Sequence, residues 1–388
     1  TMKNSALLPS LLAAISRRCE GRHTLTATIR ANPGEHDVAF GFAAAIARAL
    51  AALPGAAGVS GETARELIAL DPALSSRFAA SPSTVEGGEA VRRRALAFVD
   101  ILEAISEQNS LALCLDDLQW ADAASCQLLA MACGRLSSLR ILIVATTRGS
   151  HSPIFDQRTV ITHALLPLSR DDVVDAIRSS GSWPETPDAN RFIESLIAVS
   201  EGIPLSVVER LAFARDRRLL TLHNGVWESN SWDAASIAIA VESPLDHRLN
   251  ACPDAECAVL LAFAGAGTPL TESILLDTVN ALARATSVTL KEEARSLDRT
   301  SVLAALSSLE VKGLIVRIGD GWLPSHDVVS ERMLRGASPE KQRDCHLALA
   351  QALSISVAPE STARAVRHFL LGDNDGEAGR EFARAVSE

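Results

Sequence analysis

The sequence predicts an α/β protein with a parallel, three-layer domain at its front and smaller, mostly helical domains after it. Two observations lead to this fold class. Between residues 25 and 168, apolar segments of strand length alternate with segments of helical periodicity, which is typical of a parallel sheet covered by helices on both faces. Beyond Ser169 the pattern becomes almost entirely helical. A chain of 388 residues has room for roughly two to four domains.

The composition is that of a globular protein from a reducing compartment. The net charge is −10 with a pI near 5.5, so no basic surface for nucleic acid is expected. The sequence has no apolar run long enough to cross a bilayer, and its seven cysteines follow neither a disulfide nor a zinc-site spacing. We therefore expect a cytoplasmic protein without membrane contact. Because the chain begins with Thr1, we expect it to be a piece of a longer protein.

The front domain is expected to alternate strands with helices. Leu25–Ile29 alternates β-branched residues with others, as a strand does. Leu111–Leu115 and Leu139–Ala145 are apolar runs too short for amphipathic helices, so they are predicted as buried strands. A last strand is expected over Ala164–Leu168. Helices are predicted over Ser5–Arg18, Ala39–Leu53, Ala90–Glu107 and Ala123–Leu136.

The remaining chain is expected to form helical parts with short hairpins. Asn224-Gly225 predicts a hairpin over Leu219–Trp227, and the polar, Ala-rich Ser229–Ala240 is expected to be a linker. Helices followed by two short strands, Leu314–Ile318 and Trp322–Pro324, have the order of a winged helix. The last helices are expected to begin a helical-repeat array. Helices are predicted at residues 171–179, 189–200, 205–215, 254–263, 272–283, 301–312, 340–353, 364–371 and 377–386.

The strand at Leu111–Leu115 leads directly into two adjacent acidic residues, Asp116 and Asp117. Buried carboxylates are costly unless a cation or a hydrogen-bond donor is near, and ligands of parallel α/β sheets bind beyond the C-terminal ends of the strands. This is the Walker B pattern of P-loop NTPases, in which Asp116 would hold Mg²⁺ and Asp117 would orient or deprotonate the attacking water. The alternative is that an acidic residue here only caps the next helix, which is our interpretation of Asp122.

Four segments, LCLDDLQWAD, LIVATTR, EGIPL and PSHDVVSERML, occur in an order that resembles the ATPase module of STAND-type signal-transduction proteins, a branch of the AAA+ NTPases. The large ATP-binding regulators of the LuxR type in bacteria are the most similar. The resemblance covers essentially the whole chain. It implies a P-loop NTPase core over residues 1–168, a helical lid over 169–235, a winged-helix domain over 236–335 and the start of TPR-like helical repeats over 336–388.

The resemblance also implies roles for single residues. Arg148 would read the terminal phosphate, Pro204 of the Gly202-Ile203-Pro204 segment would pack on the adenine, and His326 would approach the ADP phosphates. Each has a simpler alternative. Arg148 would then be a surface loop charge, Pro204 a helix-start proline and His326 a hydrogen-bonded interface residue.

The front of the chain departs from the family pattern. A P-loop needs glycines, a lysine and a Ser or Thr after a strand. The segment KNSALL resembles the tail of that motif, but Lys3 and Asn4 stand where the family has Gly and Lys, and the first strand is missing. Ser5 keeps the position of the Mg²⁺-binding hydroxyl. The chain is either cut inside the motif or decayed, and we expect it to bind nucleotide no tighter than roughly millimolar.

Two functions of different classes follow from these patterns. The first is an ATP/ADP-operated switch of a bacterial transcriptional regulator, with ATP or ADP and Mg²⁺ as cofactors, an output domain outside this chain and a possible ligand-dependent oligomer. The second is a decayed, non-hydrolysing NTPase that serves as an interaction scaffold, with an unknown inducer or partner protein bound by its C-terminal helices. DNA binding by the wing itself is disfavoured because Asp320 offsets Arg317.

Overall fold

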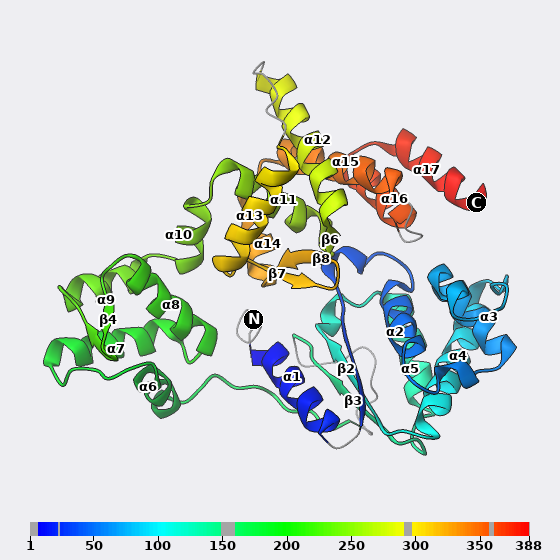
Figure 1. Ribbon diagram of the computed structural model, residues 1–388, viewed down its shortest axis with the longest axis horizontal. Helices are drawn as coiled ribbons and strands as arrows, with labels where there is room; N and C mark the ends of the chain where they lie inside the picture. The colour runs from blue at the N-terminus through cyan, green and yellow to red at the C-terminus, as the bar shows by residue number, and fades with distance from the viewer. Residues whose placement is uncertain (1–6, 22–23, 149–159, 291–296, 357–360, 388) are drawn as a thin grey trace. The chain divides into compact units, whose positions relative to one another are not determined.

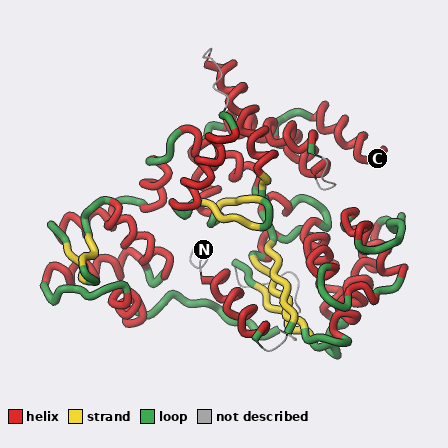
Figure 2. The backbone as a smooth tube through the Cα atoms, in the orientation of Figure 1, coloured by secondary structure: helices red, strands yellow, loops and turns green. Residues whose placement is uncertain are grey.

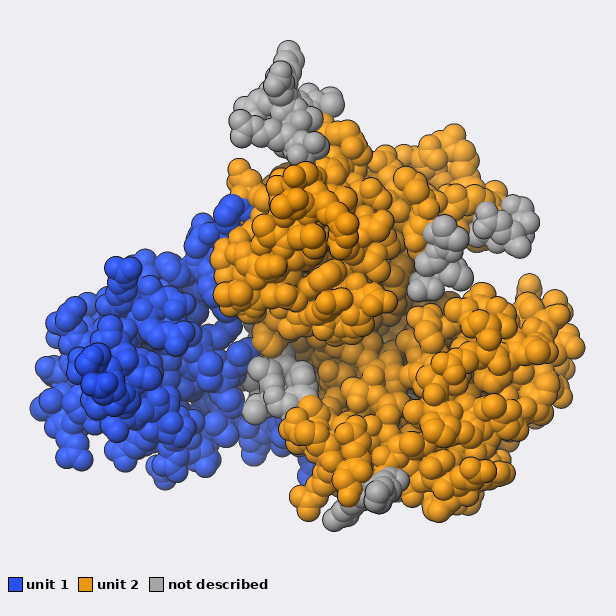
Figure 3. Space-filling model, in the orientation of Figure 1, with its two compact units in different colours: residues 1–10, 162–253 blue, residues 11–161, 254–388 orange. Residues whose placement is uncertain are grey.

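The computed structural model describes residues 7–21, 24–148, 160–290, 297–356 and 361–387 (Figure 1). The chain divides into two compact units (Figure 3). The larger unit combines residues 11–161 with residues 254–388, and the smaller unit contains residues 1–10 and 162–253. Within the ranges that the structure describes, no helix has the length and apolar character needed to cross a membrane.

The larger unit begins with a parallel sheet of three strands in the order β1-β2-β3 (Figure 2). Strand β1 covers Leu25–Arg30, β2 covers Leu111–Asp116 and β3 covers Ile141–Ala145. The register pairs Arg30 with Asp116 at the ends of β1 and β2. All six residues of β2 are buried, which explains why its sequence is a continuous apolar run up to the aspartate.

Helices cover the sheet on two sides, so this part of the chain is a three-layer α/β structure, as predicted. Helix α1 (Leu7–Glu20) lies along one face, where the Ser16 hydroxyl is 3.4 Å from that of Thr28 in β1 (Figure 1). Helices α2 (Gly41–Ala51), α4 (Gly87–Ser106) and α5 (Ala123–Cys133) lie on the other, with α3 (Gly61–Leu70) outside α4. Short 3-10 helices are η1 (Pro33–Glu35), η2 (Ala56–Gly58), η3 (Pro72–Ser76) and η4 (Leu118–Trp120).

The prediction of a strand over Ala164–Leu168 is wrong. These residues form no regular structure, and Leu166 is 78% exposed. Within the described ranges, no strand pairs with this apolar run, and its Leu168 N–H donates to the carbonyl of Gly202. Strand β3 therefore ends the sheet: among the described residues no strand pairs with its outer edge, and Leu142 is 53% exposed there.

The C-terminal part of the larger unit, residues 254–388, is helical around a small antiparallel sheet. Its strands are β6 (Leu270–Thr271), β7 (Ile315–Ile318) and β8 (Gly321–Pro324), in the order β6-β8-β7. The winged-helix and helical-repeat interpretations of this part stay predictions. Its helices are α11 (Asp254–Ala266), α12 (Glu272–Leu290), α13 (Arg299–Val311), α14 (Asp327–Gly336), α15 (Pro339–Ile355), α16 (Ser361–Leu371) and α17 (Asp375–Ser387).

The smaller unit has its own apolar core, in which Trp183 stacks on Phe192 and on Trp227. The hairpin predicted at Asn224-Gly225 is confirmed: both residues have the positive φ that a two-residue hairpin turn requires. The elements of this unit are α6 (Arg170–Ser179), α7 (Pro187–Ser200), α8 (Pro204–Asp216), β4 (Thr221–His223), β5 (Val226–Glu228), α9 (Trp232–Val241) and α10 (Pro244–Asn250).

The prediction that Ser229–Ala240 is a linker is wrong, because helix α9 occupies most of that stretch. Ser231 caps the helix by accepting a hydrogen bond from the Ala234 N–H. Ala235 and Ile239, four residues apart, are fully buried in the core of the smaller unit. The high alanine content that suggested a linker instead serves close packing of a short helix.

Candidate functional site

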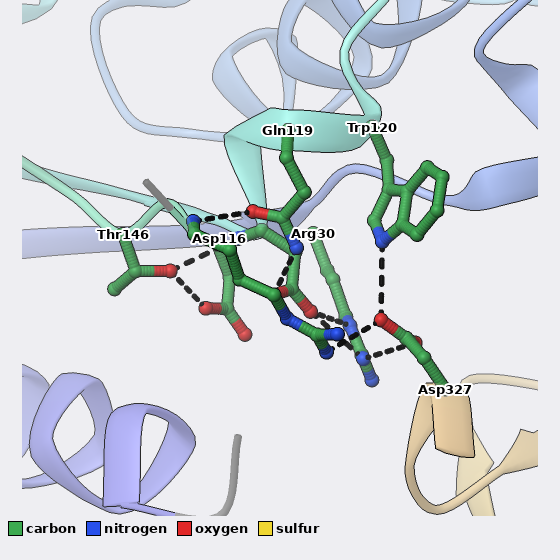
Figure 4. A network of polar contacts seen from close by, with 8 residues as sticks. Arg30, Asp116, Gln119, Trp120, Thr146 and Asp327 are labelled. Atoms are coloured by element: carbon green, nitrogen blue, oxygen red, sulfur yellow. Dashed lines mark hydrogen bonds and ion pairs between the residues drawn. The ribbon is translucent and has the colours of Figure 1, made fainter. Parts of the chain in front are cut away.

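The acidic pair lies at the C-terminal end of β2, as the sequence predicts, and both side chains are buried. Asp116 is 6% and Asp117 7% exposed. The hydroxyl of Thr146, the residue after β3, donates to Asp116 Oδ1 at 2.5 Å (Figure 4). Burial raises the pKa of the Asp116 carboxyl above its ordinary value, and the Asp117 charge acts in the same direction. A carboxylate in this position gains more than an exposed one from a nearby cation.

Asp117 turns the chain sharply where β2 ends. Its backbone is left-handed, with φ of 56° and ψ of 43°, a conformation that aspartate tolerates better than most residues. The same Thr146 hydroxyl accepts the Asp117 N–H at 3.0 Å, and the Thr146 carbonyl accepts the Leu118 N–H at 2.9 Å. Thr146 thus ties the ends of β2 and β3 together and holds both carboxylates at one edge of the sheet.

Both carboxylate oxygens of Asp117 have partners. Arg30 Nε donates to Oδ2 and Gln119 Nε2 donates to Oδ1, each at 2.8 Å. Arg30 is the last residue of β1, and the parallel register places it directly beside Asp116. Sequence reasoning did not single out this arginine. The available signal was a lone basic residue at the end of the strand that pairs with the acidic strand.

Arg148 lies at the same edge, two residues beyond Thr146. Its N–H donates to Gln119 Oε1 at 3.1 Å, which fixes the start of its loop. Its guanidinium donates at 2.6 Å to Oδ2 of Asp327, the first residue of α14. The indole N–H of Trp120 donates to the same oxygen at 3.1 Å. Arg30 lies 3.4 Å from the other oxygen, so three side chains of the α/β part converge on Asp327 (Figure 4).

Asp122 is a structural residue, and its interpretation as a helix cap is confirmed. Its carboxylate accepts the Ser125 N–H at 2.9 Å at the start of α5. It also accepts the Phe40 N–H at 2.8 Å and the Phe42 N–H at 3.2 Å. These bonds join the loop before α2 to the segment after β2, so Asp122 supports the site without lining it.

The other predicted site residues have different positions. His326 precedes Asp327 as the N-cap residue of α14, and its carbonyl accepts the Val329 N–H at 2.9 Å. Pro204 is the first residue of α8 in the smaller unit. Its role near a nucleotide stays a prediction. Ser5 lies outside the described residues. Asp116, Asp117 and Arg148 therefore form one cluster, joined by Arg30, Trp120 and Asp327, which the sequence did not assign to the site.

The cluster offers oxygen and guanidinium groups rather than a preformed metal cage. Among the described residues, no three His, Cys, Asp or Glu side chains are grouped to hold an ion. Mg²⁺ commonly binds through one or two carboxylates and completes its shell with water and phosphate oxygens. The Asp116 carboxylate fits such a site. Arg148 and Arg30 supply positive charge at the same edge of the sheet.

Residues 5–144 match the family described as AAA ATPase domain, which supports an AAA+/P-loop NTPase module in this part of the chain. An uncharacterized protein of Rhizobium meliloti (strain 1021) is 29% identical over 224 residues, which are 51% of this chain and 21% of the relative. This chain thus matches about a fifth of that relative's length.

A solved structure gives a weaker likeness. The Walker-type ATPase of Pyrococcus abyssi has 14% sequence identity and a TM-score of 0.27, over 83% of this chain and 87% of that one.

Proposed function

We propose, from the AAA ATPase match over residues 5–144, that this chain is the switch module of an ATP/ADP-operated signal-transduction protein of the STAND type. The observation that carries the proposal is the bond between the acidic strand end and the C-terminal part. Arg148, at the edge where nucleotide phosphates would lie, holds Asp327 at 2.6 Å. A nucleotide that engages Arg148 would therefore act directly on α14. A switch needs such a difference between two states.

Roles for the site residues belong to the proposal. Asp116 would bind Mg²⁺, which would shield the charge of the phosphates. Asp117 would orient the attacking water, and Arg148 would contact the terminal phosphate. Ser5, Pro204 and His326 would contribute a metal-binding hydroxyl, an adenine contact and an ADP phosphate contact. Because both oxygens of Asp117 are bonded here, its work as a base would require Arg30 or Gln119 to move.

The wider assignment extends the same proposal. The protein would be a LuxR-type transcriptional regulator of the cytoplasm, with the winged helix and TPR-like helices passing the nucleotide state to an output domain. An inducer or partner protein would bind the C-terminal helices. In this proposal the segment binds neither a membrane nor DNA directly.

The test is an ATPase assay on a version of the chain that carries an intact P-loop ahead of Ala6. We expect micromolar ATP binding and slow turnover. Asp117→Asn should keep ATP binding and abolish turnover, because it keeps the shape of the side chain and removes its basicity. Asp320→Asn, in the exposed turn between β7 and β8, is the control and should hydrolyse ATP normally. Unchanged hydrolysis by Asp117→Asn would remove Asp117 from its proposed role.

The scaffold alternative has one observation in its favour. Lys3 and Asn4 stand where a P-loop has Gly and Lys, and each lost charge-assisted phosphate bond costs about 1.5–3 kcal/mol. A scaffold would bind its partner equally well with ATP, with ADP or without nucleotide. Calorimetry on the chain as it stands is expected to find no ATP affinity tighter than roughly millimolar. Micromolar binding by the unaltered chain would contradict the interpretation of this segment.

A further inference from the structure

Asp327 occupies a site that the α/β part forms for a negatively charged group. Three donors from separate segments meet on its carboxylate: Arg30 at 3.4 Å, Trp120 at 3.1 Å and Arg148 at 2.6 Å. They lie 297, 207 and 179 residues away from Asp327 in sequence. The Asp327 side chain is 10% exposed and those of Arg30 and Arg148 about a fifth exposed, so the contact is partly shielded from water.

The donors are held in place by the α/β part itself. The Arg30 guanidinium is bonded to Asp117, and the backbone of Arg148 is bonded to Gln119, which is in turn bonded to Asp117. Trp120 lies in η4, and its backbone N–H donates to the Asp117 carbonyl. None of these supports comes from the C-terminal part. The donor set would therefore persist if Asp327 moved away, and the guanidinium of Arg148 and the indole N–H of Trp120 would then lack this acceptor.

The donors around Asp327 are shared unequally between its two oxygens. Asp327 presents two oxygens to three donors, so Oδ2 accepts from both Arg148 and Trp120 while Oδ1 has only the longer contact with Arg30. A phosphoryl group presents three oxygens and more negative charge. Arginine binds carboxylates and phosphates with the same planar fork of N–H groups. The same three donors can therefore also accept a phosphoryl group in place of the Asp327 side chain.

We propose that Arg30, Trp120 and Arg148 form a phosphoryl-binding site and that Asp327 is a tethered carboxylate that blocks it. A phosphoryl group and Asp327 cannot occupy the three donors together, so binding of one displaces the other. The inference rests on the proposed function, because it names how that nucleotide site would be regulated. It adds Arg30 and Trp120 to the anion contacts and gives Asp327 the role of an intramolecular inhibitor.

Displacement of Asp327 is expected to loosen α14 without separating the two parts. Next to the site, the Gly34 N–H donates to the Gly267 carbonyl at 3.0 Å, and Arg364 of α16 donates to Glu35 at 2.7 Å. These contacts connect the same segment, residues 30–37, to the C-terminal part. They would keep Asp327 close, as a competitor of high effective concentration.

The experiment measures pyrophosphate binding to the full 388-residue chain by calorimetry. Pyrophosphate supplies phosphoryl oxygens without adenine and so separates this site from the rest of a nucleotide site. Asp327→Asn should bind it about tenfold tighter than the unaltered chain, because the apparent affinity scales with the fraction of molecules whose site is open. Asp320→Asn makes the same change of charge on an exposed residue and should change the affinity less than twofold.

A second substitution places the effect at the site. Arg148→Gln, added to Asp327→Asn, should abolish the tenfold gain. Equal affinities for the unaltered chain, Asp327→Asn and Asp320→Asn would overturn the proposal, as would a gain that survives Arg148→Gln.

A hydrogen-exchange measurement on the unaltered chain tests the same proposal without any variant, so it does not depend on whether a variant folds. Pyrophosphate should speed amide exchange at the start of α14, and potassium chloride of equal ionic strength should not. Identical exchange in both salts would also overturn the proposal. A positive result here with no ATP turnover in the P-loop version would leave this site standing and remove the proposed ATPase switch.

Discussion

Two regions of the larger unit are held together by different forces. The core around β2 is apolar: Phe42, Phe98 and Ile101 are at most 1% exposed, and it joins α2, α4 and α5 to the sheet. We define the seam as the contacts of residues 30–37 and 116–148 with residues 254–388. It has a polar centre in Asp327 and, at its rim, the more exposed Arg364–Glu35 pair. A charged ligand can replace one partner of an ion pair, but it cannot replace the packing of apolar side chains. The core therefore fixes the sheet, and the seam is the place where a charged ligand can act.

The largest effect is expected when the core is opened. Phe98→Ala removes a fully buried ring from α4 and should lower the free energy of unfolding by about 3–5 kcal/mol. Urea unfolding followed by circular dichroism measures this loss. If Phe98→Ala costs less than about 1 kcal/mol, the core is not the stabilising region that the comparison requires.

A smaller effect is expected from acid, acting on two histidines of the C-terminal part. His346 of α15 and His368 of α16 lie with their Nδ1 atoms 3.1 Å apart. Burial lowers the pKa of His346 to about 4, with Arg367 acting in the same direction. Burial lowers the pKa of His368 as well, helped by His346, Arg367 and Arg364. Both rings therefore stay neutral in the folded protein at pH values where the unfolded chain takes up protons.

The sign of the pH dependence follows from these lowered values. Above pH ~7 neither state binds a proton at these rings, so stability does not change there. As the pH falls from about 6.5 toward 4, the unfolded state gains protons first, and His346 alone should cost about 3 kcal/mol by pH 4. Urea unfolding between pH 7 and 4 measures the slope, which is the change in the free energy of unfolding with pH. His346→Gln should reduce the slope by the share of His346 and leave the share of His368, whereas His223→Gln on exposed β4 should leave the slope unchanged. A slope of full size in His346→Gln would refute the assignment.

The smallest effect is expected at the rim of the seam. Arg364 and Glu35 are 18% and 17% exposed, so Arg364→Ala should cost about 1 kcal/mol, and less as salt rises. Arg93, paired with Glu89 on the surface of α4, is 41% exposed and serves as the matched control. Arg93→Ala should leave the free energy of unfolding nearly unchanged, because water screens an ion pair on the surface. Hydrogen exchange of residues 33–36 should rise in Arg364→Ala only. The same exchange in both variants would mean that the rim pair adds nothing to the seam.

The predictable features were those with a local physical cause. The alternation in β1 and the apolar runs of β2 and β3 predicted their strands, Asp116 and Asp117 marked the end of β2 where the polar cluster lies, and Asp122 followed helix-capping rules. Errors arose where local pattern and tertiary context conflict. The apolar run at Ala164–Leu168 found no partner strand, and the alanine-rich segment after Ser229 found a core to pack against.

The residues that complete the site have no local signature. Arg30, Trp120 and Asp327 are ordinary members of a strand, a turn and a helix until the fold brings them together over as many as 297 residues. The sequence did indicate one neighbour, since His326-Asp327 was part of the family resemblance. The resemblance assigned a role to the histidine, which stays a prediction, and the structure adds the contacts of Asp327 with Trp120 and Arg148.

The contact between Gly34 and Gly267 has a consequence for how this sequence can diverge. A Cβ atom on Gly34 would lie 2.1 Å from the Ala266 carbonyl oxygen, and one on Gly267, where φ is +64°, would lie 2.6 Å from the Gly34 nitrogen. Neither position can acquire a side chain unless the two backbones separate. Across relatives that keep this contact, both glycines should be as invariant as Asp116, although neither performs any chemistry. The two glycines would then be invariant because the two backbones lie close together. A search for catalytic residues by invariance alone would select both, although neither has a reactive group.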